Sequence, residues 1–368
     1  MTCDFFKLAT KGAQALQPYQ PGKPIEELER EYGIKNAIKL ASNENPTGIS
    51  PLVVTAIQAH LQELPRYPDG NGFRLKQALA AYHSRTINNV VLGNGSNDIL
   101  DLVARAFVTA QDSVLFSAHA FAVYPIVTQA IGAKMIITPA KNWGHDLIAM
   151  RQAIEPNTKL IFIANPNNPT GTWVSKTELQ AFLDSVPETI IIVLDEAYFD
   201  YMDAPDYPDS SLWLDRYPNL VVARTFSKAY GLAALRIGYA LAHPDIINLL
   251  NRVRQPFNVN SLALIAAEVA LQDRAYVMNA IALNKVGLAK LTQGFEKMGI
   301  NYIPSRANFI TFDLGKPALP VYEALLREGV IVRPIGSYGM PNHLRVTVGL
   351  PEENERFLQS LKKVLTKP

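Results

Sequence analysis

The stretch Arg224–Tyr239 reads RTFSKAYGLAALRIGY and brings a lysine together with hydroxyls and a second arginine. The residues before it, Leu220–Ala223, are apolar and few enough to form a buried strand. Lys228 therefore follows a strand of the core, where burial lowers the pKa of an amine and leaves it able to capture a carbonyl. A single lysine is more often a solvated surface residue, so this interpretation depends on the motifs around it.

Apolar runs that alternate with helical patterns predict the fold around this strand. The run Thr189–Leu194 reads TIIIVL, as expected for a strand that is covered on both faces. Lys159–Ala164 is a similar run, and the capping box Ser175–Glu178 opens a helix after it. This alternation predicts an α/β fold with a large domain, in which helices cover both faces of a mostly parallel sheet. From about Asn258 the pattern becomes helical and then mixed, which predicts a smaller α+β domain.

The chain is long enough for two domains. We expect residues 1–45 to form an N-terminal arm and part of the small domain, residues 46–270 the large domain, and residues 271–368 the small C-terminal domain. Prolines interrupt residues 17–24, so the first 45 residues are expected to be irregular apart from a short helix at Glu26–Tyr32.

The composition excludes several classes of function. A formal charge of +2, with 48% hydrophobic and 18% charged residues, describes a globular chain without the basic surface that nucleic acid or an acidic membrane attracts. The single cysteine, Cys3, cannot form an internal disulfide framework or a cysteine-based metal cluster. No apolar stretch approaches the length of a membrane span or a leader peptide, so we expect a cytoplasmic protein without a bound metal.

The turn Gly93–Asp98, which reads GNGSND, separates a short apolar run from an amphipathic helix. A glycine turn at a helix start is a site for anions, because unpaired backbone N–H groups meet there. Asp98 stands where a dinucleotide-binding turn has its third glycine, so the phosphate of a smaller cofactor fits better. The ordinary alternative is a helix with Ser96 as its N-cap.

Polar motifs follow three of the predicted strands. Asn165–Gly171 reads NPNNPTG, Asp195–Tyr198 reads DEAY, and the third motif contains Lys228. Each could be a turn, a helix cap or a solvated charge on its own. Together they lie at the carboxyl edge of one sheet, where ligands of such folds bind. The combination predicts a site with a lysine for an imine, an acid that keeps a ring nitrogen protonated, and hydroxyls with an arginine for a phosphate.

These motifs resemble those of fold-type I pyridoxal-phosphate aminotransferases, and most closely the histidinol-phosphate aminotransferase family. The resemblance covers nearly the whole chain, in the family's order: LASNENPTGISP, LPRYPDG, GNGSNDI, HAFAVYP, NPNNPTG, DEAYFDY, RTFSKAYGLAALRIGY and LRVTVG. It implies pyridoxal 5'-phosphate as cofactor and a ping-pong Schiff-base mechanism in histidine biosynthesis. The implied reaction interconverts L-histidinol phosphate and 2-oxoglutarate with imidazole-acetol phosphate and L-glutamate.

The resemblance also implies roles around the cofactor ring. Lys228 would form the Schiff base and then serve as base and acid in the 1,3-proton shift. Asp195 would pair with the pyridine nitrogen and keep the ring an electron sink. Tyr198 and Asn168 would hydrogen-bond the phenolate oxygen. Phe121 would cover one face of the ring, where many relatives carry a tyrosine.

The cofactor phosphate and the dimer are implied in the same way. Arginine suits a phosphate because its rigid fork matches the oxygens. Tyr67 would reach the phosphate of a neighbouring subunit, which implies a homodimer with shared sites. The remaining residues implied to hold the phosphate are Ser96, Asn97, Thr225, Ser227 and Arg236.

The substrate end of the site rests on fewer residues. Arg345 in LRVTVG resembles the arginine that binds a substrate carboxylate, and Asn308 would lie beside it. Tyr19 and Arg333 resemble residues near the distal end of the substrate. The ordinary alternatives are packing under the N-terminal arm for Tyr19 and a surface ion pair for Arg333.

Two departures from the family's pattern bear on substrate choice. His119 and Ala120 replace Pro and Thr of the usual loop, and Ala234 takes a position where glycine is common. Neither change removes catalytic chemistry, but the first could alter the preference of the pocket. Two related activities therefore stay open, an aminotransferase for aromatic amino acids and a decarboxylase of threonine phosphate.

Two hypotheses of other classes are weaker. A non-catalytic binding module predicts loss of the lysine or of the acid, yet Lys228 and Asp195 are both present. A nicotinamide-dependent oxidoreductase accounts for the glycine turn only and leaves the other polar motifs unexplained.

Overall fold

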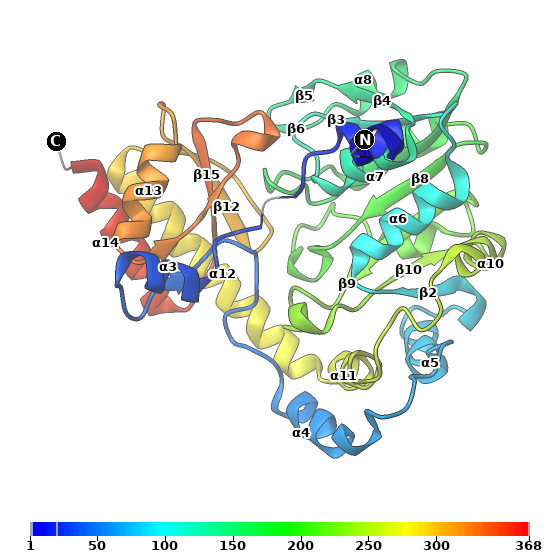
Figure 1. The fold of residues 1–368 in the computed structure, drawn as a ribbon, viewed down its shortest axis with the longest axis horizontal. Coiled ribbons are helices and arrows are strands. Elements are labelled where there is room, and N and C mark those ends of the chain that lie inside the picture. The colour runs from blue at the N-terminus through cyan, green and yellow to red at the C-terminus, as the bar shows by residue number, and fades with distance from the viewer. Residues whose placement is uncertain (1–2, 20, 367–368) are drawn as a thin grey trace.

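The computed structural model describes residues 3–19 and 21–366, and its centre is a seven-stranded sheet (Figure 1). β10 is antiparallel to both of its neighbours, and the other adjacent strands are parallel. The expected mostly parallel sheet is therefore confirmed. In spatial order the strands are β2 (Val90–Gly93), β10 (Gly238–Ala242), β9 (Leu220–Thr225), β8 (Ile191–Asp195), β7 (Thr158–Ala164), β3 (Ser113–Ser117) and β4 (Lys134–Thr138).

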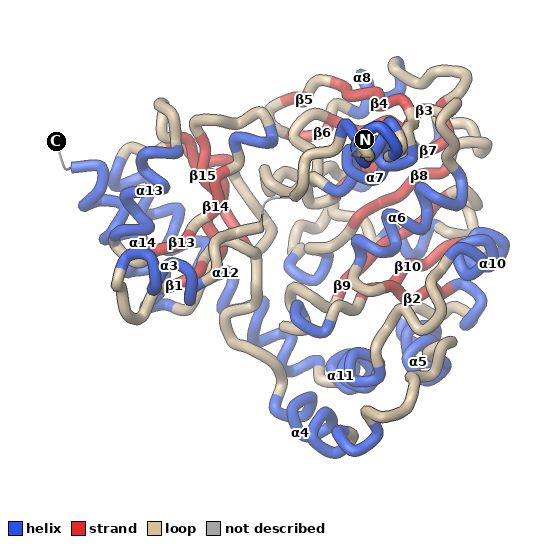
Figure 2. The backbone as a smooth tube through the Cα atoms, in the orientation of Figure 1, coloured by secondary structure: helices blue, strands red, loops and turns tan. Residues whose placement is uncertain are grey.

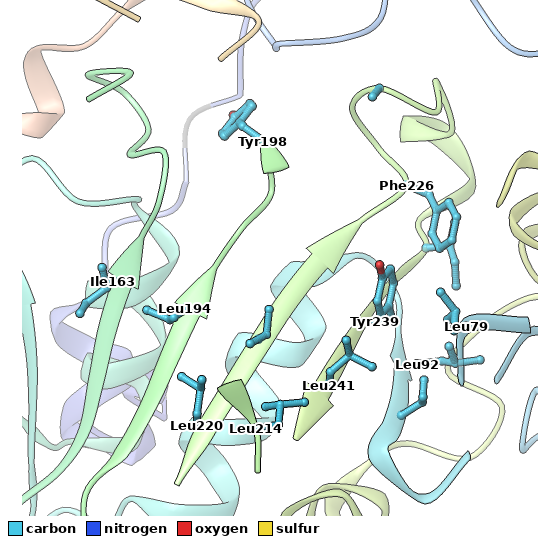
Figure 3. Packing of buried hydrophobic residues seen from close by; sticks show 14 of the residues in the cluster. Leu79, Leu92, Ile163, Leu194, Tyr198, Leu214, Leu220, Phe226, Tyr239 and Leu241 are labelled. Carbon is cyan, nitrogen blue, oxygen red and sulfur yellow. The ribbon is translucent and has the colours of Figure 1, made fainter. Parts of the chain in front are cut away.

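Helices cover both faces of this sheet, as the continuous apolar strands require. Alternate residues of β9 point to opposite faces: Leu220 and Val222 belong to one apolar core, and Val221 and Ala223 to another. Figure 3 shows the first of these cores along the strands. The helices are α4 (Pro51–Ala59), α5 (Phe73–Tyr82), α8 (Leu147–Gln152), α9 (Lys176–Ser185) and α11 (Ser261–Gln272) over the first core, and α6 (Ser96–Phe107), α7 (Val123–Ile131) and α10 (Pro244–Val253) over the second.

A smaller four-stranded antiparallel sheet has a core of its own (Figure 2). Its strands in spatial order are β11 (Asn301–Ile303), β12 (Phe309–Asp313), β15 (His343–Thr347) and β14 (Arg333–Pro334). Next to it, β1 (Ile38–Lys39) pairs with β13 (Val330–Ile331), so the N-terminal segment joins this part of the molecule. The accompanying helices are α3 (Ile25–Tyr32), α12 (Arg274–Met298), α13 (Leu319–Arg327) and α14 (Pro351–Thr366).

Some elements differ from expectation. The first residues are not irregular, because Asp4 and Thr10 cap the short helices α1 (Phe5–Leu8) and α2 (Lys11–Ala15). Residues 330–334 form two short strands, β13 and β14, which pair in different sheets. Other short elements are the hairpin β5 (Ala140–Lys141) and β6 (Gly144–His145), and 3-10 turns at Leu61–Glu63, Ile87–Asn89, Phe199–Tyr201, Ser210–Trp213, Ala233–Leu235 and Gly336–Tyr338.

Within residues 3–19 and 21–366, no helix combines the length and the apolar character that crossing a bilayer demands.

Candidate active site

A pocket lies at the carboxyl ends of β7, β8 and β9, where the sequence predicts a shared site. Ala164, Asp195 and Thr225 line it from the ends of these strands, and Arg333 and Arg345 line it from the smaller sheet. Its empty volume is about 910 Å³ with the open mouth included. Residues of both sheets therefore face one space that is open to solvent.

The pocket brings together all predicted site residues except Tyr67 and Asn308. The segments that supply them come from the N-terminal arm, the start of α6, the strand ends of the large sheet and the smaller sheet. The predicted residues that line the pocket are Tyr19, Ser96, Asn97, Phe121, Asn168, Asp195, Tyr198, Thr225, Ser227, Lys228, Arg236, Arg333 and Arg345.

Lys228 lines this pocket. Its Nζ donates to the carbonyl of Ser42 at 3.3 Å and lies 5.8 Å from the centre of the Tyr198 ring. Burial, aided by the positive charge of Arg345, lowers the pKa of Lys228 to about 8. A sizeable fraction of the amine is therefore neutral and nucleophilic near neutral pH.

Asp195 is the acid at the end of β8. Its Oδ2 accepts a hydrogen bond from the Tyr124 hydroxyl at 2.9 Å, and its Oδ1 accepts one from the Ala197 N–H at 3.3 Å. The residue is 5% exposed, and burial raises its pKa to about 6 despite these donors. A carboxylate held in this way favours a positively charged partner in the pocket.

Tyr198 and Asn168 are fixed by partners that differ from their predicted cofactor contact. The Tyr198 hydroxyl accepts from Asn43 Nδ2 at 2.8 Å, and burial raises its pKa to about 12. Asn168 Oδ1 accepts from a guanidinium nitrogen of Arg345. Both side chains still line the pocket, so the phenolate contact predicted for them remains a prediction.

The start of α6 forms a cradle with Arg236. A Cβ built on Gly95 would lie 2.1 Å from Arg236 Nη2, so only a glycine permits this approach. Arg236 Nη1 also donates to the Ser227 hydroxyl at 3.4 Å. Hydroxyls, a guanidinium and a helix N-terminus thus converge at one corner, a combination that binds phosphate.

Ser96 is not the N-cap of α6, contrary to the ordinary alternative considered for the sequence. Gly95 occupies the N-cap position with φ 79°, and no side chain caps the helix. The Ser96 hydroxyl is therefore not used for capping and belongs to a residue that lines the pocket.

Arg345 and Asn308 hold the loop that precedes α4. Arg345 Nη2 donates to the Ala41 carbonyl at 2.7 Å, while its buried Nε has no hydrogen-bond partner among the described residues. Asn308 Nδ2 donates to the backbone carbonyls of Asn43 and Glu44 at 3.0 and 3.4 Å. Asn308 and Arg345 thus hold the same loop, Asn308 is not among the residues that line the pocket, and its place at the substrate stays a prediction.

Tyr19 and Arg333 meet at the mouth of the pocket. Arg333 Nη2 donates to the Tyr19 hydroxyl at 3.4 Å, and its guanidinium carbon lies 5.5 Å from the centre of the Tyr19 ring. Tyr67 is elsewhere: it is 83% exposed and stacks on Phe257.

Several residues that line or support the pocket carried no prediction of their role. Asn43 and Tyr124 stand inside the quoted motifs LASNENPTGISP and HAFAVYP, but their partners Tyr198 and Asp195 are far along the chain. Tyr338 also lines the pocket and precedes LRVTVG by a few residues. The motifs identify the right segments, and only the fold shows which side chains meet.

The described residues contain no group of three or more His, Cys, Asp or Glu side chains placed to hold a metal ion.

Comparison with known proteins agrees with the site. The family model for class I and II aminotransferases matches residues 35–361. Histidinol-phosphate aminotransferase 2 of Pseudomonas fluorescens is 58% identical over the full length of both chains, and histidinol-phosphate aminotransferase 1 of Nitrosococcus oceani is 55% identical over 98% of each.

The fold has solved counterparts. Histidinol-phosphate aminotransferase of Sinorhizobium meliloti in complex with pyridoxal-5'-phosphate is 29% identical, covers 97% of both chains and has a TM-score of 0.90. An aspartate aminotransferase of Thermus thermophilus, at 23% identity and a TM-score of 0.84, shares the fold. The pocket and these similarities lead to one conclusion: the chain belongs to the class I and II aminotransferase family.

Proposed function

We propose that this protein is a pyridoxal-phosphate-dependent histidinol-phosphate transaminase. It would interconvert L-histidinol phosphate and 2-oxoglutarate with imidazole-acetol phosphate and L-glutamate. The observation that carries the transaminase chemistry is the partly buried amine of Lys228, with its lowered pKa, in one pocket with the buried acid Asp195. The substrate is proposed because full-length relatives at 55–58% identity bear that name.

The residues of the pocket fit this cofactor. The cradle of Gly95, Ser227 and Arg236 suits a phosphate, and the close approach at Gly95 leaves no room for a larger side chain. Asp195 suits a ring nitrogen, because the pKa raised by its burial makes a cationic partner favourable. Phe121 lines the pocket and offers a flat apolar surface to a ring.

When bound, pyridoxal phosphate supplies an aldehyde and a ring that stabilises negative charge at the substrate's α-carbon. Lys228 supplies the amine that holds the aldehyde, and its pKa near 8 lets it accept and return a proton at that carbon. Asp195 keeps the proton on the ring nitrogen. Tyr124 holds the Asp195 carboxylate in place through its 2.9 Å hydrogen bond.

Arginines orient the substrate in this proposal. Arg345 lines the pocket, and its Nε has no hydrogen-bond partner among the described residues, which supports assigning the guanidinium to the carboxylate of glutamate or 2-oxoglutarate. Arg333 and Tyr19 lie at the mouth and are assigned to the distal phosphate of histidinol phosphate. One pocket then accepts the carboxylate of glutamate in one half-reaction and the phosphate of histidinol phosphate in the other.

The proposal includes a homodimer in the cytoplasm. Exposed apolar side chains gather on α4, the loop after it and the start of α5, as expected for a surface that another subunit covers. They are Leu52, Leu64, Tyr67 and Phe73. Tyr67 is assigned to the cofactor phosphate of the partner subunit, and the cytoplasmic location stays as the sequence predicts it.

The test compares the purified protein with Lys228→Ala and with Lys297→Ala, a change on the exposed end of α12. The wild type and Lys297→Ala should be yellow with cofactor and should form glutamate from histidinol phosphate and 2-oxoglutarate. Lys228→Ala should lose transfer by about 10² to 10⁴-fold or more, because covalent and acid–base chemistry both depend on this amine. Mass spectrometry after borohydride reduction should find the pyridoxyl group on Lys228.

Two outcomes would favour a different activity on the same fold. Faster turnover of phenylalanine than of histidinol phosphate favours the aromatic aminotransferase, and release of carbon dioxide from threonine phosphate favours the decarboxylase. Native transamination by Lys228→Ala rejects the mechanism itself.

A further inference from the structure

A second cavity lies beside α8 and α9, separate from the pocket of Lys228. Residues of these helices and of the hairpin β5–β6 line it, and none of its lining residues lines the first pocket. Its empty volume is about 960 Å³ with the open mouth included, against about 910 Å³ for the first pocket. In Figure 1, α8 lies at the top of the view and α4 at the bottom, so the apolar surface assigned to the homodimer is away from this cavity.

Apolar side chains form much of the lining of this second cavity. Val174 and Phe182 are buried, and Leu147 is partly buried. Ile148 also lines the cavity and is 69% exposed, although it is a large apolar side chain. A ligand with an apolar body would remove these atoms from water, which is the main source of affinity in sites of this kind.

His145 adds a polar atom without a partner to this apolar lining. The residue is 8% exposed, and its Nε2 donates to the backbone carbonyl of Ala164 at 2.8 Å. Burial lowers the pKa of His145, so the ring is neutral and its other nitrogen, Nδ1, is an acceptor. This buried Nδ1 has no hydrogen-bond partner among the described residues. A buried acceptor in this state is stabilised by any donor that a ligand brings to it.

The charged side chains of the cavity favour an anion. Lys141 and Arg151 are both exposed, and neither forms a salt bridge with another residue of the described ranges. The acids beside them are engaged: Asp146 caps α8, and Glu178 belongs to the capping box of α9, so each carboxylate already accepts from a backbone N–H. The guanidinium of Arg151 and the ammonium of Lys141 therefore remain for the carboxylate of a ligand.

We propose that this cavity binds a small aromatic acid, an apolar ring that carries an N–H or O–H donor and a carboxylate. The ring packs on Phe182 and Val174, and its donor bonds to His145 Nδ1. The carboxylate pairs with Arg151. An aromatic N–H or O–H suits these walls, because it brings one donor on a flat and otherwise apolar body. The inference does not depend on the proposed function, since the first pocket shares none of these residues.

The probe is indole-3-acetate, which has an aromatic ring, an N–H and a carboxylate. Calorimetric titration of the full-length protein should show one site per chain, with the same affinity whether or not pyridoxal phosphate is present. Two analogues test the assigned contacts. 1-Methylindole-3-acetate has no N–H and indole-3-acetamide has no charge, so each should bind about tenfold more weakly.

Two variants with matched controls locate the site. Ala181 lines the cavity from an exposed position of α9, so Ala181→Trp fills the space and should weaken binding of indole-3-acetate about tenfold or more. Arg151→Glu reverses a charge in the last turn of α8 and should have a similar effect. The controls are Ala282→Trp at an exposed position of α12 and Arg252→Glu in the last turn of α10, which should bind like the wild type.

Absence of binding by the wild type, or native affinity of Ala181→Trp, overturns the site. Displacement of the probe by pyridoxal phosphate also overturns it, because the probe then occupies the pocket of Lys228. Native affinity for either analogue rejects the ligand class. If Ala181→Trp does not fold, hydrogen exchange of the wild type decides: the probe should slow exchange in peptides that span α8 and α9, and unchanged exchange there rejects the site. Failure of transamination leaves all these readings intact, since they measure binding outside the first pocket.

Discussion

Lys228 and Asp195 line one pocket, and burial shifts the pKa of each so that its neutral form becomes more populated. The pKa of Lys228 falls to about 8, and that of Asp195 rises to about 6. Both shifts have burial as their largest cause, since removing water penalises either charge. The cofactor-free site is therefore prepared for a ligand that brings a carbonyl to the amine and a positive charge to the acid.

The shift of Lys228 predicts how cofactor capture depends on pH. The neutral amine is the reactive form and its fraction rises with pH, so capture of pyridoxal phosphate should accelerate with pH and level off above about 8. Stopped-flow absorbance of the cofactor between pH 6 and 9.5 measures this rate. A model amine with an ordinary lysine pKa, as control, should still be accelerating at pH 9.5. A rate that is flat over this interval contradicts the shift.

At the scale of elements, the ends of secondary structures create the binding groups. The N-terminus of α6 meets Arg236 because Gly95, with φ 79°, turns the chain without a side chain in the way. Behind the strand ends, Arg224 of β9 pairs with Glu196 at 2.8 Å and with Asp209 at 2.7 Å. Arg224 and Glu196 are almost fully buried, so this pair ties β8 to β9 where Asp195 and Lys228 emerge.

Gly95→Ala should weaken cofactor binding. The added Cβ would lie 2.1 Å from Arg236 Nη2 and displace the guanidinium. Loss of a charged hydrogen bond predicts affinity for pyridoxal phosphate that is roughly tenfold to a hundredfold lower, measured by titration. Gly299→Ala is the matched control, because it has φ 65° with nothing within 4 Å, so it carries backbone strain alone. Equal affinities in the two variants would reject the cradle.

Glu196→Gln should destabilise the protein strongly. It leaves the buried guanidinium of Arg224 with the partly exposed Asp209 as its remaining charge partner, which predicts a loss of about 3 kcal/mol in the free energy of unfolding, at the low end for a broken buried ion pair. Denaturant unfolding of the cofactor-free protein measures it. In the control, Asp184→Asn breaks the exposed pair with Arg216 and should cost about 1 kcal/mol or less. Similar costs for both changes would mean that the buried pair has no special part in stability.

At the scale of the whole molecule, the pocket needs both halves of the chain. The large sheet carries the lysine and the acid, and the smaller sheet supplies Arg333 and Arg345. Figure 1 shows both sheets in one view. The N-terminal arm links them, since α2 packs on α7 and β1 pairs with β13. The domain limits at residues 45 and 270 stay predictions.

The assignment of Tyr67 to the partner subunit's cofactor predicts that active sites are shared between subunits. In one chain it is 83% exposed, outside the pocket and stacked on Phe257. If it serves the partner's cofactor, mixing inactive Lys228→Ala with weakened Tyr67→Ala should restore activity, because a hybrid dimer contains one intact site. Turnover of the mixture after subunit exchange, together with sedimentation, measures this. The control mixes Lys228→Ala with Asp195→Asn, two changes in residues that line the same pocket of one chain.

The control and the test give opposite outcomes if the sites are shared. Two changes that serve the same chain's site do not complement, because each site of the hybrid dimer then contains one of them. Lys228 and Asp195 line one pocket, so their hybrid has two damaged sites and should stay inactive. Activity of the Tyr67 mixture no higher than the mean of its parents, or a monomer in sedimentation, contradicts sharing.

The sequence by itself predicted strands β7, β8 and β9, the start of α9 and the residue types of the site, but it did not predict β10. These follow from local patterns: the continuous apolar run that became β8, the capping box Ser175–Glu178 that opens α9, and polar residues directly after strands. Neighbours a few residues away decide such features. The parallel order then brings the strand ends to one edge, so the predicted residues could be placed together without knowing any contact.

Only the tertiary structure decided which side chains meet. Asn43 holds Tyr198 over a separation of 155 residues, Tyr124 holds Asp195 over 71, and His119 holds Tyr338 over 219. The same applies to Asn308, which binds a loop instead of lining the pocket. Such pairs depend on how distant segments pack after their loops close, and no local pattern carries that information.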